Sequence, residues 1–233
     1  MYLLANNAFI GSDRRIAKQL SDTTISLSLP EIAHALSPYV KQPLTDSQLS
    51  SVSAYLSLLR KWNQTIPLTS LDDEPEIVAR HFGESIFASQ WLSLQSSRLA
   101  DVGSGAGFPG LPLKIIFPSL QLTLVESNAK KCAFLREVID LLDLRNVQIV
   151  RKSYEEFAAL QSFDYICARA LGNYRRLLQW SRQAIKPGGQ VILWLGIDDS
   201  ISICRIKGWN WDLPINIPES RRRILLVGTK IQD

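Results

Sequence analysis

Four glycines and an aspartate fall within ten residues of one stretch, LADVGSGAGFPGLPLKIIF at 99–117. The stretch is strand-like up to Val102, and a helical pattern follows the glycines. Between these segments, Gly103, Gly105 and Gly107 let the backbone curl tightly and approach a ligand without side-chain hindrance. We therefore expect a ligand-binding turn that connects a strand to a helix.

An acidic residue, Glu126, ends the next strand-like segment, about 20 residues beyond this turn. A carboxylate in such a place accepts hydrogen bonds from ribose hydroxyls, so the two features together predict a cofactor that contains adenosine. Which cofactor remains open here, because Gly105, Gly107 and Gly110 also spell the G-x-G-x-x-G fingerprint of dinucleotide-binding proteins. That match starts two residues after Gly103, where the tight turn begins.

Polar side chains also follow the third and fourth expected strands. Tyr154, Glu155 and Glu156 could flank an adenine ring, although acids in a first helical turn are also favoured by the helix dipole. Arg169 could steer a substrate base or hold a cofactor carboxylate, or it could form a structural salt bridge. Cys167 lies within an apolar strand pattern, and we expect a buried thiol there.

The elements that position these residues alternate between strand and helix from residue 98 onward. An alternation of apolar strands and helices predicts a parallel sheet covered on both faces, here a doubly wound α/β fold. KPGG at 186–189 is expected to close the last helix, and WNWDLP and RRRILLVGTK could form an antiparallel closing pair. The expected strands are 98–102, 120–126, 147–150, 163–168 and 189–195, and the expected helices are 110–117, 128–142, 153–160 and 173–186.

The N-terminal part predicts helices. LTDSQLSSVSAYLSLLRKWN carries an apolar stripe, and a second helix is expected to start near Pro75. We therefore divide the chain into a loose extension at 1–28, a helical cap at 29–95 and the sheet domain at 96–233.

Composition limits the classes of protein that remain. The chain of 233 residues is 46% hydrophobic and 21% charged with a net charge of +4, values that are ordinary for a soluble enzyme. Its three cysteines and two histidines lack metal-ligand spacing, which argues against a metal site and favours a reducing compartment. No signal peptide or membrane-spanning segment is expected, so we predict a cytoplasmic protein.

Five segments together resemble one family. KWNQTIPLTS, RHFGES, DVGSGAGFPGLPL, LVESNAKKCAFLRE and FDYICARAL, in this order and spacing, are similar to bacterial small-subunit rRNA guanine-N7 methyltransferases, also called the glucose-inhibited division protein B family. The resemblance runs from about Leu44 to Leu195. It implies a class I, Rossmann-like methyltransferase sheet with a helical N-terminal cap, and S-adenosylmethionine (SAM) as the cofactor.

The resemblance also implies which residues bind SAM and what the enzyme methylates. The implied substrate is one guanine of 16S rRNA or of the small ribosomal subunit; neither a membrane nor a metal is implied, and we expect a monomer. His81 of RHFGES could face the cleft or be structural. The implied cofactor-binding residues are Gly103, Gly105, Phe108, Glu126, Ser127, Tyr154, Glu155 and Arg169.

The chemistry of this substrate agrees with what the sequence lacks. Guanine N7 carries an in-plane lone pair and no proton, so its methylation needs no general base, and positioning supplies most of the acceleration. ARAL stands after the fourth expected strand, where methylation of an exocyclic amine would call for an Asp/Asn-Pro-Pro-aromatic motif. Two other functions remain possible from the sequence: a nicotinamide-dependent oxidoreductase, and a non-catalytic RNA-binding assembly factor with the same fold.

Overall fold

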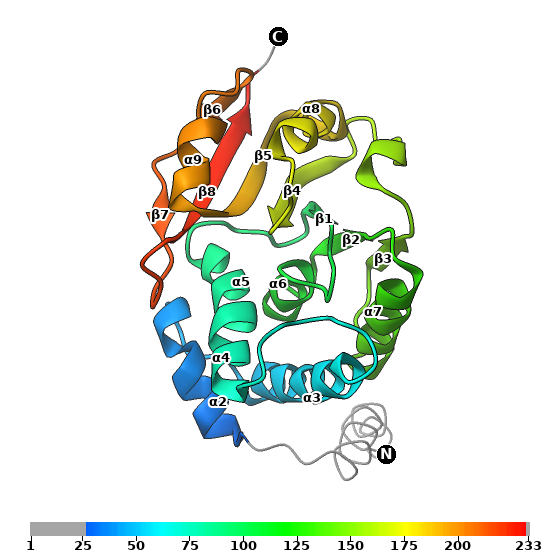
Figure 1. Cartoon of the computed structure of the whole chain (residues 1–233), viewed down its shortest axis with the longest axis vertical. Helices are drawn as coiled ribbons and strands as arrows, with labels where there is room; N and C mark the ends of the chain where they lie inside the picture. Colours follow the sequence, from blue (N-terminus) through cyan, green and yellow to red (C-terminus); the bar gives the residue numbers. More distant parts are fainter. Residues whose placement is uncertain (1–26, 232–233) are drawn as a thin grey trace, which may run out of the picture.

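An eight-stranded mixed sheet forms the centre of the computed structural model, which describes residues 27–231 (Figure 1). The strands lie in the order β3-β2-β1-β4-β5-β8-β6, and β7 pairs with β8 off this path. Strands β1 to β5 are parallel, whereas β8 runs antiparallel to β5, β6 and β7. The strands are β1 (Arg98–Val102), β2 (Gln121–Val125), β3 (Val147–Val150), β4 (Phe163–Arg169), β5 (Ile185–Gly196), β6 (Trp209–Trp211), β7 (Ile215–Asn216) and β8 (Arg223–Lys230).

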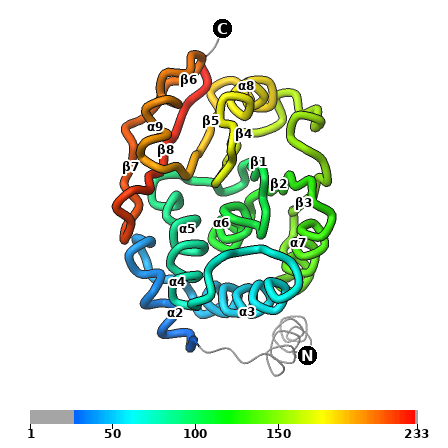
Figure 2. Tube along the Cα trace, viewed as in Figure 1, coloured from blue at the N-terminus to red at the C-terminus, as the bar shows by residue number. Residues whose placement is uncertain are grey.

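Helices cover both faces of this sheet, which confirms the doubly wound fold (Figure 2). One face carries α2 (Leu29–Leu36), α3 (Asp46–Asn63), α4 (Glu74–Ile77), the π-helical η2 (Val78–Gly83), α5 (Glu84–Phe87), α6 (Gly110–Ile116) and α7 (Ala129–Leu141). The other face carries α8 (Tyr174–Ala184) and α9 (Ile197–Ile203). Short 3-10 turns occur at η1 (Ser37–Tyr39), η3 (Ala88–Gln90) and η4 (Tyr154–Glu156).

The cap helices form where capping residues and apolar spacing predict them. Thr45 caps α3, because its hydroxyl accepts the Gln48 backbone N–H while the Gln48 side chain accepts the Thr45 N–H, and each such cap is worth about 1 kcal/mol. The second expected helix forms as α4, η2, α5 and η3 in succession, and Pro75 lies in its first turn.

The cap shares its core with the sheet. Ile32 of α2 and Tyr55 of α3 are fully buried in the same cluster as Leu122 of β2 and Ile192 of β5. Each Å² of apolar surface buried in this shared cluster contributes about 25 cal/mol, so burial stabilises the packing of the cap on the sheet. The boundary between cap and sheet domain at residue 95/96 therefore divides the sequence rather than the hydrophobic core.

Two expected boundaries are wrong. The helix expected at 153–160 is only the 3-10 turn η4, because Phe157 turns extended and its carbonyl accepts the Trp180 Nε1–H at 3.0 Å. KPGG does not close a helix: α8 ends at Ala184 and β5 begins at Ile185, with a register shift between Phe163 and Tyr165 of the partner strand β4.

Most of the expected extension at 1–28 falls outside the described residues, although Ser28 is the N-cap of α2. Within 27–231, no helix is long and apolar enough to cross a membrane. The expected antiparallel closing pair is confirmed, since β6 pairs with β8 through Trp209 and Lys230.

Candidate cofactor and substrate site

The glycine turn lies at the carboxyl end of β1, as expected. Gly103, Gly105 and Gly107 have φ of +70°, +57° and +87°, the region that glycine enters without a Cβ penalty. A Cβ on Gly107 would lie 2.5 Å from the Tyr55 hydroxyl, so this position is closed by packing. A Cβ on Gly105 would meet nothing closer than the Gly103 carbonyl at 3.7 Å. The turn is therefore packed on its cap side and open beside Gly105.

Glu126 is fixed against this turn directly after β2. Its Oε2 accepts the Gly105 backbone N–H at 2.9 Å and its Oε1 accepts the Asn128 N–H at 2.8 Å. Each carboxylate oxygen keeps a second lone pair, so the group can still accept a hydrogen bond from a ligand. Ser127, the neighbouring predicted residue, is exposed.

Asp101 and Cys167 lie below the turn on paired strands. The Asp101 Oδ2 accepts the Gly110 N–H at 3.0 Å, which joins the end of β1 to the start of α6. Burial, together with the nearby Glu126 charge, raises the pKa of Asp101 to about 7. The Cys167 thiol is fully buried, as expected, and burial raises its pKa well above the ordinary range. It is therefore a packing residue and not a nucleophile.

Tyr154 and Glu155 lie in η4, after β3, and their surroundings differ. The Tyr154 ring is half-buried with its centroid 5.7 Å from that of Trp180, in a cluster that includes Leu171. Leu171 in turn packs against Gly103, since a Cβ there would lie 2.8 Å from the leucine Cδ1. Glu155 is exposed, and its Oε1 lies 3.7 Å from the Arg176 Nη1. Leu171 thus packs on the turn, and Tyr154 packs against the same hydrophobic cluster as Leu171.

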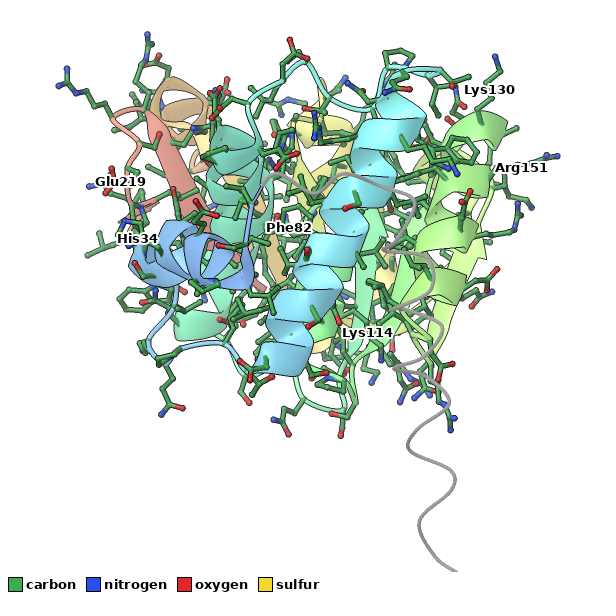
Figure 3. The ribbon with its side chains drawn as sticks, turned by 90° about the horizontal axis from the view of Figure 1, so that it is seen from below. His34, Phe82, Lys114, Lys130, Arg151 and Glu219 are labelled. Atoms are coloured by element: carbon green, nitrogen blue, oxygen red, sulfur yellow. The ribbon has the colours of Figure 1, made fainter. Side chains whose placement is uncertain are left out.

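The Phe108 ring packs against the cap. Its ring stacks on Tyr55 at 5.4 Å and on His81 at 4.9 Å, and meets the edge of Phe82 at 5.1 Å. Phe82 lies between α2 and α3 in the view from the cap (Figure 3). The Tyr55 hydroxyl also donates to the Ala106 carbonyl. Phe108 therefore anchors the turn to the cap, and its role in cofactor binding stays a prediction.

Arg169 ends β4 and is largely buried, with 14% of its side chain exposed. Its Nη2 lies 3.4 Å from Glu84 Oε2 and 3.4 Å from His81 Nδ1. Its Nη1 is buried and has no hydrogen-bond partner among the residues that the structure describes. The salt bridge, one of the alternatives that the sequence left open, is thus present, and one buried donor of the guanidinium is left without a partner in the described part of the chain. Ala170, with φ of +54°, turns the chain sharply directly after it.

Glu84 is the site residue that the sequence did not indicate. Its carboxylate is 1% exposed and also binds Arg223 Nη2 at 2.7 Å, so it joins the ends of β4 and β8. Burial raises the pKa of Glu84, and the arginines beside it oppose that shift. RHFGES contains this residue, but no local spacing pairs it with an arginine so distant in the chain.

His81 is held as a neutral side chain between Thr69 and Arg169. Since arginine only donates, Nδ1 accepts from Arg169, and Nε2 carries the proton and donates to Thr69 Oγ1 at 2.6 Å. Burial and the neighbouring arginines, Arg169 foremost, lower its pKa to about 3. His81 lies in the π-helical η2, a kind of turn that often occurs at functional sites.

The structure therefore joins Gly105 to Glu126 through a hydrogen bond at the carboxyl edge of the sheet, and Gly103 lies in the same turn. Arg169 lies at the end of the neighbouring strand. That edge is where doubly wound sheets bind their ligands. Within 27–231, no group of three or more metal-ligating side chains gathers.

Comparisons with known sequences agree with one another. A model of the family described as rRNA small subunit methyltransferase G matches residues 48–205. A ribosomal RNA small subunit methyltransferase G from Roseiflexus castenholzii is 38% identical over 200 residues, which cover 81% of this chain and 86% of the relative. One from Xanthomonas axonopodis pv. citri is 33% identical over 204 residues, covering 85% and 95%.

Solved structures show the same fold at low identity. A SAM-dependent methyltransferase from Aquifex aeolicus superposes with a TM-score of 0.58 at 13% identity, covering 69% of this chain and 95% of its own. The M. jannaschii protein TYW2, solved in complex with AdoMet (SAM), gives 0.55 at 15% identity, covering 72% and 78%. Together with the sequence matches, these show a SAM-dependent methyltransferase: the chain belongs to the rRNA small subunit methyltransferase G family.

Proposed function

We propose that this protein transfers the methyl group of SAM to N7 of a guanine in 16S rRNA, within the cytoplasm. The relatives carry small-subunit rRNA methyltransferase names, and solved structures with this fold include a SAM-dependent methyltransferase and a protein in complex with AdoMet. The observation that carries the proposal is the arrangement at the carboxyl edge, where Glu126, the open side of Gly105 and the unpartnered donor of Arg169 lie at the ends of the neighbouring strands β2, β1 and β4.

The residues at this edge fit the groups of SAM. Glu126 has acceptor capacity for the ribose hydroxyls, and Ser127 adds a hydroxyl beside it. The unpartnered Nη1 of Arg169 is a buried donor that a carboxylate would satisfy, since leaving it unpaired costs about 1–3 kcal/mol. Tyr154 and Glu155, which follow β3 at the edge of the sheet next to β2, are proposed to contact the adenine.

The cofactor supplies an electrophilic methyl group on a sulfonium. The protein needs no base for this transfer, because guanine N7 has a free in-plane lone pair. His81 agrees with that, since its pKa of about 3 keeps it neutral and both of its ring nitrogens have partners. What the chain supplies is orientation and exclusion of water, which together can account for several kcal/mol of the barrier.

Arg169 is proposed to do most of the positioning. Glu84 and His81 hold its Nη2 from the cap, which leaves Nη1 as the group that meets a ligand. Because its partners come from η2 and α5, the cap takes part in the site rather than only covering it. A preorganised charge of this kind costs no rearrangement at the moment of reaction.

Two alternatives, a nicotinamide-dependent oxidoreductase and a non-catalytic assembly factor, predict experimental results that differ from those of a methyltransferase. The nicotinamide reading is not favoured, because β1 ends at Val102 and the positive-φ turn begins at Gly103, two residues before the fingerprint starts. A non-catalytic assembly factor would bind rRNA and leave it unmethylated.

The test is calorimetric titration with S-adenosylhomocysteine and with NAD, followed by methyl transfer from labelled SAM to unmodified small-subunit rRNA. We expect binding of S-adenosylhomocysteine alone, and Glu126→Ala should weaken it by about 1–3 kcal/mol. Asp140→Ala, which removes the same charge from the exposed face of α7, is the matched control and should bind normally. Binding of NAD alone, or binding without methyl transfer, would contradict the proposal.

A further inference from the structure

A hollow of about 630 Å³ lies between the cap and the loop that precedes β8. Four arginines line it, Arg80 from η2 and Arg221, Arg222 and Arg223 from the loop and the start of β8. We call it the arginine hollow, and its other lining residues are Tyr39, Glu76, Ala79, Glu219 and Ser220.

Positive charge exceeds negative charge in the arginine hollow, because four guanidinium groups face the carboxylates of Glu76 and Glu219. Arg80 pairs with Glu76 at 2.5 Å, but both side chains are about 40% exposed, and exposed pairs of this kind hold their partners weakly. Arg222 pairs with Asp198, again with both groups mostly exposed. Arg221 is exposed and has no ion pair within the described part of the chain. Three of the four arginines are thus available to an anion.

The arginine hollow adjoins the methyl-transfer site. Arg223 lines it and shares the buried carboxylate of Glu84 with Arg169. In the sheet register, Arg223 pairs with Gly196, the last residue of β5, so this end of β8 lies at the carboxyl edge. In the view of Figure 3, Glu219, which lines the hollow, lies on the same side of the molecule as His34 and on the opposite side from Lys130 and Arg151.

We propose that the arginine hollow binds the phosphodiester backbone of the rRNA next to the target guanine. The proposal rests on the proposed function, since a guanine that reaches Arg169 must bring its neighbouring phosphates to the same edge of the sheet. Guanidinium groups suit this partner because their planar forks bind phosphate oxygens in pairs. Phosphate contacts of this kind set affinity and register and carry no sequence information.

The test compares three triple variants of the whole protein. Arg80→Gln with Arg221→Gln and Arg222→Gln removes three positive charges from the arginine hollow. The same positions changed to lysine keep the charge and serve as the rescue. The matched control is Arg145→Gln with Arg205→Gln and Lys207→Gln, which removes three charges from exposed residues near the amino-terminal edge of the sheet. Arg223 is left in place because it compensates the buried Glu84.

Binding to unmodified, protein-free small-subunit rRNA is measured against salt concentration. Each phosphate contact adds about 0.7 to the slope of log K on log salt for single-stranded RNA, so losing three lowers the slope by about 2. At 0.1 M salt that corresponds to an affinity loss on the order of 100-fold. We expect this loss in the glutamine triple, a wild-type slope in the lysine triple and the control, and normal S-adenosylhomocysteine binding in all three.

Several outcomes would overturn the inference. A glutamine triple whose slope of log K on log salt equals that of the wild type would show that the RNA does not cross the arginine hollow. The same conclusion would follow if the glutamine triple and the control triple had equal slopes. Loss of binding to the assembled small subunit with unchanged binding to protein-free rRNA would point to an acidic protein surface instead. A wild-type protein that neither binds nor methylates rRNA would refute the proposed function itself, and this surface with it.

Discussion

Replacing Arg169 by methionine separates a residue that acts in catalysis from one that only stabilises the fold. The substitution keeps most of the side-chain volume and removes the guanidinium. Glu84, which would otherwise be left as an uncompensated buried charge, keeps its 2.7 Å ion pair with Arg223. The change also removes the buried Nη1 that has no partner in the described structure.

The expected magnitudes follow from these contacts. Breaking a buried ion pair costs about 3–5 kcal/mol when one charge is left alone, so retention of Arg223 should keep the cost of Arg169→Met in folding free energy to about 1–2 kcal/mol. Methyl transfer should fall on the order of 100-fold or more, which corresponds to about 2.7 kcal/mol of transition-state stabilisation.

The assay measures thermal unfolding and single-turnover methylation on the same preparation of Arg169→Met. A folded protein whose turnover drops far more than its stability would agree with the proposed role. A folded variant with near-normal turnover would refute the reasoning, because Arg169 would then be only a structural partner of Glu84.

Three further predictions concern stability. The pKa of Asp101 rises from 3.8 to about 7 on folding, so the folded state binds this proton more tightly than the unfolded state. The contribution of Asp101 to the free energy of unfolding should therefore fall by up to ~4 kcal/mol as pH rises from about 4 to 7. Chemical denaturation at several pH values should show that Asp101→Asn lacks this pH-dependent part of the stability. The pH dependence of stability due to His81 has the opposite sign, because the pKa of His81 falls from 6.5 to about 3 on folding. The free energy of unfolding should therefore decrease as pH drops below about 6.5. A His81→Gln variant that kept this decrease would contradict the prediction that His81 is neutral in the folded protein. Gly107→Ala should cost at least 1 kcal/mol in unfolding free energy, since its φ is +87° and a Cβ would lie 2.5 Å from the Tyr55 hydroxyl, whereas Gly172→Ala, with open space around it, is the control.

Local patterns predicted the strands, the glycine turn and Glu126, because each depends on residues close together in the chain. Periodicity places β1, β2 and β3 within a residue or so, and the parallel order brings Glu126 beside Gly105. Predicted element boundaries were wrong where tertiary contacts determine them. Phe157 is not helical and its carbonyl accepts a hydrogen bond from Trp180, and the pairing of Ile185 with Phe163 extends β5.

The contacts that the cap contributes to the site could not be predicted from local sequence patterns. His81 and Arg169 were both singled out as candidates, but their contact, and the Glu84 carboxylate that joins Arg169 to Arg223, depend on how η2 and α5 pack over the sheet. Ion pairs between distant elements leave no trace in local spacing. Phe108 was predicted to bind the cofactor, and that role stays a prediction; its stacking on Tyr55 and His81 of the cap left no signal in the local sequence.

Mass mapping of modified guanines in small-subunit rRNA, from cells with and without this protein, tests the central claim most directly. We predict that one N7-methylguanosine is present with the protein, absent without it, and strongly reduced when Arg169→Met replaces the wild type. Identical guanine modification in the two kinds of cell would contradict the account.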